Sequence, residues 1–262
     1  MANWTPERQR STTAFYDKYV DKLLADIVRP NRRTEAAIRY ALEQTAYQID
    51  ARRILDVGCG IGWSAYELAR HFPAAHVHAI DLSAQLVAKA QHLFERPNLS
   101  FEQADLHDAH YWTAQAPFDV IVLLDVYEHL PAVDRPVLES RLAEMLRPGG
   151  RIVLTTPSVA HQNYLRTHRP EGLQPVDEDV DLAILQQFAR RAGLTVLEYR
   201  MRSLWQSGDY YHSTLGTVAS ETELLVLPPD LEPLHDRSRR LYRRGCLSFR
   251  QLVRAYLRSL RR

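Results

Sequence analysis

Glycine occupies every second position directly after a short apolar run, in the sequence ILDVGCGIGW from Ile54 to Trp63. Residues 54–57 have the composition of a buried strand, and Gly58, Gly60 and Gly62 follow them. Glycine has no Cβ, so it adopts positive φ angles and lets a ligand lie against the backbone. A helix that begins after the glycines would direct free backbone N–H groups towards that ligand. The run predicts a strand, a turn and a helix around a small-molecule site.

The spacing of the glycines distinguishes between two ligands. The dinucleotide fingerprint G-x-G-x-x-G would need glycine where this chain has Trp63, a side chain too bulky for close approach of a pyrophosphate. The pattern D-x-G-x-G-x-G, from Asp56 to Gly62, resembles instead the first signature of the class I S-adenosylmethionine-dependent methyltransferases. The acidic Asp56 suits a cationic ligand better than a phosphate. A glycine-rich turn that binds nothing is the alternative.

Apolar runs and helical periodicities alternate after this turn. Helices are expected at 64–72, after Ser83, before the LRPGGR turn and at 179–192. Strands are expected at 54–57, 77–81, 99–103, 118–124, 151–155 and 195–199, with a last, antiparallel strand at 223–227. This alternation predicts a Rossmann-like, doubly wound α/β fold: a mostly parallel seven-stranded sheet with helices on both faces.

Two further segments flank the α/β domain, which we assign to residues 51–232. Residues 1–50 are predicted to be a helical cap, with helices at 14–28 and from Thr34 to about 48, and with Tyr16 and Tyr19 as candidate lid residues. Residues 233–262 are predicted to form a basic amphipathic helix, because residues 237–262 contain ten Arg and no acidic residue. Such a helix could dock on its own domain, form a homodimer or contact an anionic membrane, and docking is preferred.

Composition narrows the function classes. A net charge of +1 gives no reason to expect nucleic acid, and two cysteines are too few for a disulfide framework or a structural zinc site. No apolar run approaches the ~18 residues of a membrane span. The N-terminal residues lack the apolar core of a signal peptide. We therefore expect a cytoplasmic protein that acts on a small molecule.

Carboxylates follow successive strands, at the edge where α/β folds bind ligands. Asp81 suits the ribose hydroxyls of an adenosine, and Asp81-Leu-Ser resembles the second signature of the same methyltransferases. The resemblance also implies that Asp105 accepts a hydrogen bond from the adenine amino group. For both residues the alternative is a solvated carboxylate. The full set predicted to bind S-adenosylmethionine is Asp56, Gly58, Cys59, Gly60, Gly62, Asp81, Leu82, Asp105, Leu106 and Asp125.

Asp125, Glu128 and His129 are the predicted catalytic residues. Their spacing would place them on one side of a helical turn. The order D-x-x-E-H resembles the E-x-x-E-H of ubiquinone-pathway O-methyltransferases and of small-RNA 2′-O-methyltransferases, and this resemblance implies a divalent metal. Three interpretations stay open, in decreasing preference: a pocket-lining trio, His129 as general base, and a metal site drawn from Asp125, Glu128, His129 and His161.

The sequence thus predicts a methyltransferase that acts on a hydroxyl of a small molecule. Residues 157–176 are expected to form a long polar loop facing the substrate, and residues 205–212 could add an aromatic wall. The main alternatives are an RNA 2′-O-methyltransferase, whose downstream His signature is missing, and a non-catalytic regulatory or scaffold protein that binds S-adenosylmethionine. A nicotinamide oxidoreductase is disfavoured by Trp63.

Overall fold

The computed structural model describes residues 4–29, 31–48, 50–108, 111–112, 115 and 117–217. The predicted strand at 223–227 and the predicted basic helix at 233–262 lie outside these residues. Among the helices of the described part, none is long and apolar enough to cross a membrane.

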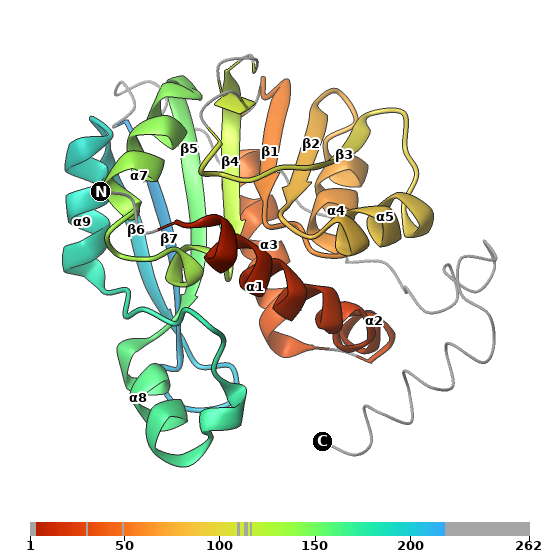
Figure 1. The fold of residues 1–262 in the computed structure, drawn as a ribbon. Coiled ribbons are helices and arrows are strands. Elements are labelled where there is room, and N and C mark those ends of the chain that lie inside the picture. Colours follow the sequence, from red (N-terminus) through yellow and green to blue (C-terminus); the bar gives the residue numbers. More distant parts are fainter. Residues whose placement is uncertain are drawn as a thin grey trace.

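A seven-stranded mixed sheet in the order β3-β2-β1-β4-β5-β7-β6 forms the centre of the molecule (Figure 1). The first five strands pair in parallel, whereas β7 runs antiparallel to both β5 and β6. The α/β prediction is therefore confirmed. The strands are β1 Arg53–Val57, β2 His76–Asp81, β3 Leu99–Gln103, β4 Phe118–Leu124, β5 Leu146–Pro157, β6 Thr195–Arg202 and β7 Tyr210–Gly216.

The antiparallel strand β7 was not predicted from the sequence, and the strand predicted at 223–227 stays a prediction. Its residues YYHSTLG do not look like a core strand, yet most of them are buried. One of its hydroxyl groups finds a partner inside the protein, since Thr214 Oγ1 lies 2.7 Å from the Tyr40 hydroxyl. Tyr210 and His212, expected in an aromatic wall, thus belong to the sheet.

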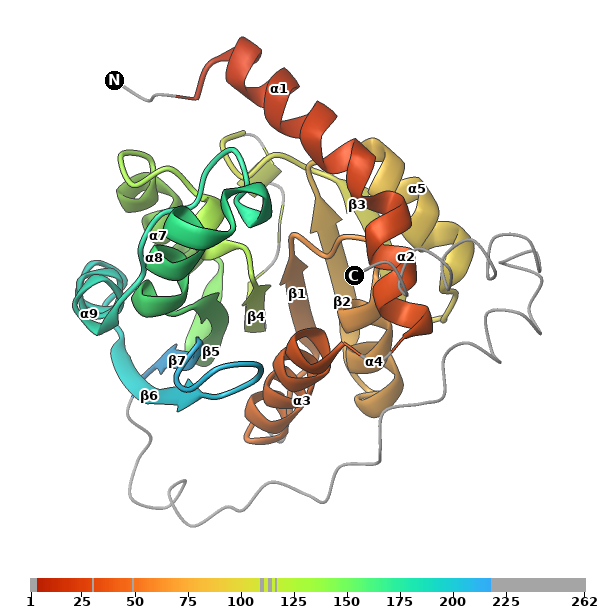
Figure 2. The ribbon, with the colours of Figure 1, turned by 90° about the horizontal axis from the view of Figure 1, so that it is seen from below.

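Helices cover both faces of the sheet. Alternate residues of one strand point to opposite faces, so Ile54 packs with α3 and α4 while Leu55 packs with α7 and α9. Figure 2 shows α3 and α4 on one side of the strands and α7 and α9 on the other. The helices after β1 are α4 Trp63–His71, α5 Ala84–Leu93, η2 Tyr127–His129, α7 Arg135–Glu144, α8 Val159–His168, η3 Pro170–Gly172 and α9 Leu182–Arg191.

The N-terminal helices differ in detail from the prediction. They are α1 Pro6–Tyr16, η1 Asp17–Tyr19, α2 Val20–Val28 and α3 Arg32–Ala46. Helix α1 begins earlier than expected because the Thr5 side chain caps it. Asn31, not Thr34, caps α3 by accepting from the backbone N–H groups of Arg33 and Thr34. The arrowheads of β1 and β2 point towards α1 in Figure 2, so this segment lies at the carboxyl ends of the strands.

The prediction of a long polar loop at residues 157–176 was wrong for its first half, where the chain forms helix α8. Ser158 caps that helix by accepting from the backbone N–H of His161. Its sequence VAHQNYLRTH has only a weak apolar stripe, and Gln162 is its one buried residue. A helix of this kind gives no clear periodic signal.

Candidate functional site

The three glycines after β1 all have positive φ angles, of 65° at Gly58, 57° at Gly60 and 85° at Gly62. They nevertheless differ in what lies beside them. A Cβ would lie 2.5 Å from Val126 at Gly58 and 2.6 Å from Phe101 at Gly62, so these two glycines permit close packing of the protein itself. At Gly60 the nearest atom, a methyl of Leu23, would be 3.3 Å away. Gly60 therefore has more room beside its backbone than Gly58 or Gly62 has.

A cavity of about 250 Å³, here called the cofactor cavity, opens at the carboxyl ends of the strands. Tyr16 and Tyr19, the candidate lid residues, line it. Most of the predicted cofactor residues also line it, namely Gly58, Cys59, Gly60, Asp81, Leu82, Asp105, Leu106 and Asp125. Asp56 and Gly62 are not part of this lining.

Asp81 connects the glycine turn to the end of β2. Its carboxylate accepts hydrogen bonds from the backbone N–H of Gly60 at 2.8 Å and of Ser83 at 2.9 Å. Burial raises the pKa of Asp81, although these N–H donors oppose the shift. The side chain is thus held at a fixed position on the cavity wall.

Asp56 was expected to face a cationic ligand, but it is buried beneath the glycine turn. Its carboxylate accepts a hydrogen bond of 2.6 Å from the Ser64 hydroxyl, at the start of α4. Burial raises the pKa of Asp56 to about 7. The residue fixes the junction between β1 and α4, and it positions the cavity without lining it.

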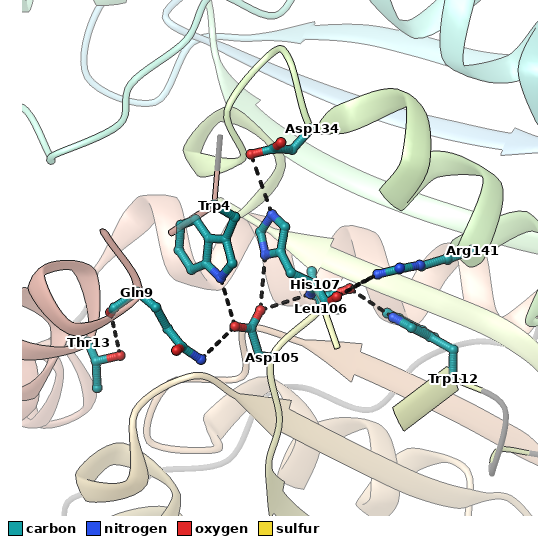
Figure 3. Close-up of polar contacts among 9 residues, drawn as sticks. All are labelled: Trp4, Gln9, Thr13, Asp105, Leu106, His107, Trp112, Asp134 and Arg141. Atoms are coloured by element: carbon teal, nitrogen blue, oxygen red, sulfur yellow. Dashed lines mark hydrogen bonds and ion pairs between the residues drawn. The ribbon is translucent and has the colours of Figure 1, made fainter. Parts of the chain in front are cut away.

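Asp105 is surrounded by donors, two of which come from the N-terminal segment (Figure 3). One oxygen accepts from the backbone N–H of His107 at 2.8 Å and from its Nδ1 at 3.0 Å. The other accepts from Trp4 Nε1 at 2.8 Å and from Gln9 Nε2 at 2.7 Å. Burial alone would raise the pKa of Asp105, but these bonds hold it below its ordinary value. Sequence reasoning missed Trp4 and Gln9.

The predicted catalytic trio stays close together but does not share one helical turn, and the charge of Asp125 contributes to the raised pKa of Glu128. Asp125 has a φ of 57° and precedes η2, so it does not share a helical turn with Glu128 and His129. Its carboxylate pairs with Arg33 at 2.7 Å and accepts from the Thr155 hydroxyl at 3.0 Å. The prediction of three side chains on one face was wrong because the chain turns sharply at Asp125.

Glu128 and His129 remain neighbours, with 3.7 Å between Glu128 Oε1 and His129 Nε2. On its other side, His129 Nδ1 donates to the carbonyl of Val176 at 2.8 Å and lies 3.2 Å from Asp177. Burial opposes a charge on the imidazole, but Glu128 and Asp177 together raise the pKa of His129. Burial also raises the pKa of Glu128. The two side chains therefore compete for one proton.

A second cavity of about 260 Å³, here called the lateral cavity, adjoins the first. His129, Arg33 and Gln174 line both cavities. The lateral cavity is also lined by His161 and Gln162 of α8 and by Glu128, Asp177, Trp205 and Tyr210. Arg33 and Asp177 are site residues that sequence reasoning did not identify.

The metal interpretation finds no support in the described residues, where no group of three or more His, Cys, Asp and Glu side chains has the geometry to hold an ion. Asp125, one of the proposed ligands, faces a guanidinium instead. His161 is on α8 and lines only the lateral cavity, so it is separated from Asp125.

Comparison with known proteins agrees with this site. Residues 54–150 match the family model described as a methyltransferase domain. The chain is 31% identical over 157 residues to a ubiquinone biosynthesis O-methyltransferase of Xylella fastidiosa, covering 56% of this chain and 62% of that protein. It is 39% identical over 106 residues to a trans-aconitate 2-methyltransferase of Deinococcus radiodurans, covering 40% of this chain and 38% of that protein. The chain thus spans less than two thirds of these relatives.

Solved structures show the same fold. Magnesium protoporphyrin IX methyltransferase of Synechocystis, with bound SAH, aligns with a TM-score of 0.57 at 18% identity, over 80% of this chain and 99% of that one. The DhpI–SAH complex aligns with a TM-score of 0.59 at 18% identity, over 80% of this chain and 96% of that one.

The fold is Rossmann-like, and Gly60 and the Asp81 carboxylate meet at the wall of the cofactor cavity. These residues fit a nucleoside: Asp81 can accept from ribose hydroxyls, and the cavity wall adds Leu82 and Leu106 as apolar contacts. Residues 54–150 are thus similar to a methyltransferase domain, and the chain resembles the class I S-adenosylmethionine-dependent methyltransferases.

Proposed function

We propose that this protein methylates a hydroxyl group of a small molecule, with S-adenosylmethionine as the methyl donor. The observation that carries the proposal is the position of His129, which lines both the cofactor cavity and the lateral cavity. A side chain there can reach an acceptor held in one cavity and directed at a donor held in the other.

S-adenosylmethionine supplies an activated methyl group on a sulfonium when it is bound. The residues proposed to hold it are those of the glycine turn together with Asp81, Leu82, Asp105 and Leu106. The lateral cavity is proposed to hold the acceptor, and its volume of about 260 Å³ suits a small molecule better than a strand of RNA. Holding the two partners in line can lower the barrier by ~7–11 kcal/mol.

His129 is proposed to take the proton of the acceptor hydroxyl. Because its Nδ1–H donates to the carbonyl of Val176, the neutral imidazole has its lone pair on Nε2. Asp177, beside Nδ1, stabilises the imidazolium that forms after proton transfer. A general base of this kind accelerates a reaction by about 10²–10⁴-fold.

The test is a transfer assay with S-adenosylmethionine labelled on its methyl group. The panel contains simple phenols, monosaccharides, organic acids and total RNA, each assayed with and without a chelator. We expect label on a phenol or a sugar hydroxyl, with loss of transfer in His129→Gln. Label on RNA alone, or on organic acids alone, would contradict the proposal. Binding of the cofactor without transfer to any member of the panel would indicate the non-catalytic alternative.

A further inference from the structure

All acceptor positions of the Asp105 carboxylate are occupied by donors of the protein itself. An ionised carboxylate has about four lone-pair sites. His107 donates to one oxygen through its backbone N–H and its Nδ1, and the indole of Trp4 and the amide of Gln9 donate to the other. In this arrangement Asp105 has no site left for a further donor.

One of these donors, the indole N–H of Trp4, belongs to a flat bicyclic ring with the shape of a nucleobase. The indole of Trp4 stacks on the imidazole of His107, with 4.2 Å between ring centroids and 12° between planes. Trp4 also lines the cofactor cavity. A flat bicyclic ring thus forms part of the cavity wall and donates its N–H to Asp105, the carboxylate proposed to accept from the adenine amino group (Figure 3).

The loop that contains Asp105 is fixed from its other side. The indole N–H of Trp112 donates to the carbonyl of Leu106 at 2.8 Å, and Arg141 donates to the carbonyls of Leu106 at 3.0 Å and His107 at 2.9 Å. Figure 3 shows Arg141 and Trp112 reaching this loop from the side opposite Trp4. These bonds hold the carboxylate in place whether or not Trp4 is present.

The segment that contains Trp4 and Gln9 is held far less firmly. Helix α1 has the sequence PERQRSTTAFY, and Thr12 is its only buried residue. Tyr16 at its C-terminal end packs against the core, but residues 4–11 include no buried side chain, so this N-terminal part separates from the domain at a low cost in free energy. Of the two partners in this contact, α1 is therefore the one that can move.

We propose that Trp4 and Gln9 form a latch that occupies Asp105 and competes with the adenine of S-adenosylmethionine. The proposal rests on the proposed function, in which Asp105 binds the adenine amino group. Cofactor binding then requires release of the latch. The apparent dissociation constant exceeds the intrinsic one by the reciprocal of the fraction of molecules in which the latch is open.

The experiment measures the affinity of the full chain for S-adenosylhomocysteine by calorimetry. The variants are Trp4→Ala, Trp4→Phe and Gln9→Leu, and Arg10→Ala is the control, since Arg10 is exposed on the same helix and lines neither cavity. We expect Trp4→Ala to bind about fivefold more tightly or better. Trp4→Phe and Gln9→Leu each remove one donor and should give smaller gains, and Arg10→Ala should bind as the unaltered chain does.

Amide hydrogen exchange of residues 6–16 supplies a second readout, which a merely structural role of Trp4 would not move. Release of the latch predicts faster exchange of these amides when S-adenosylhomocysteine is added. Unchanged or weaker binding by Trp4→Ala, or slower exchange of α1 on binding, would overturn the latch while the proposed function stands. No binding by any variant would overturn both.

Discussion

The guanidinium of Arg33 lies 2.7 Å from the carboxylate of Asp125 and joins the first turn of α3 to the end of β4. Both side chains are mostly buried, with 21% and 12% of their surfaces exposed. Asp125 also accepts from Thr155 and has a left-handed φ of 57°. This pair sets the shape of the boundary between the two cavities, because Arg33 lines both.

Loss of one partner of this pair should leave an uncompensated charge. We expect Arg33→Met to lower the free energy of unfolding by about 3 kcal/mol, since breaking a buried ion pair costs roughly 3–5 kcal/mol and this pair is partly exposed. Asp125→Asn should recover much of that loss when it is combined with Arg33→Met. Urea denaturation of the single and double variants measures the coupling, and additive effects would contradict the ion pair.

Comparison of Gly60 with Gly193 separates two effects of replacing a glycine: loss of space for a ligand and strain in a backbone with positive φ. Both have positive φ, 57° and 65°, but a Cβ at Gly193 would have no atom within 4 Å. Alanine at either position should cost about 1–2 kcal/mol of stability. Only Gly60→Ala should also weaken binding of S-adenosylhomocysteine. Equal affinities of the two variants would show that Gly60 is a turn residue and nothing more.

Stability should fall with rising pH through the titration of Asp56. Burial raises its pKa from 3.8 to about 7, so between these values the folded state holds a proton that the unfolded state has lost. The free energy of unfolding therefore decreases from pH 4 to pH 7 and levels off above that, by roughly 4 kcal/mol at 1.36 kcal/mol per pH unit. Asp56→Asn should flatten this dependence and be the more stable protein at pH 8. If Asp56→Asn had the same dependence of stability on pH as the unaltered chain, a raised pKa of Asp56 would be contradicted.

The rate of methyl transfer should rise with pH as His129 loses its proton. Since Glu128 and Asp177 raise the pKa of His129, the inflection in kcat/KM should lie above 6.5. Asp177→Asn should move the inflection to lower pH, and His129→Gln should lower kcat by about 10²–10⁴-fold. His168→Gln, at an exposed position on α8, is the matched control. An inflection that does not move in Asp177→Asn would exclude His129 as the base.

Local sequence patterns were sufficient to predict most of the fold and the centre of the cofactor cavity. The glycine turn and Asp81 lie within one strand–helix–strand unit, so their spacing along the chain determines their spacing in space. The strands β1, β2, β4 and β5 were found because buried parallel strands contain apolar runs. Strand β7 escaped detection because its tyrosines, His212 and hydroxyl residues are polar and yet buried.

The parts of the site that were missed depend on contacts between distant segments. Trp4 and Asp105 are 101 residues apart, and Gln9 and Asp105 are 96 residues apart. Arg33 meets Asp125, and His129 meets Asp177, across comparable tertiary contacts. No local pattern encodes such pairs. The trio from Asp125 to His129 was misjudged for a different reason, because helical spacing was assumed where the backbone has a left-handed residue.

The most direct test of the cofactor site is calorimetric titration with S-adenosylhomocysteine. The titration compares the unaltered chain with Asp81→Ala. Asp81 lines the cofactor cavity and fixes the backbone N–H of Gly60. Heat of binding from the unaltered chain, with an affinity at least tenfold weaker in Asp81→Ala, is the predicted result. No heat from the unaltered chain, or equal affinities, would contradict a nucleoside site at this glycine turn.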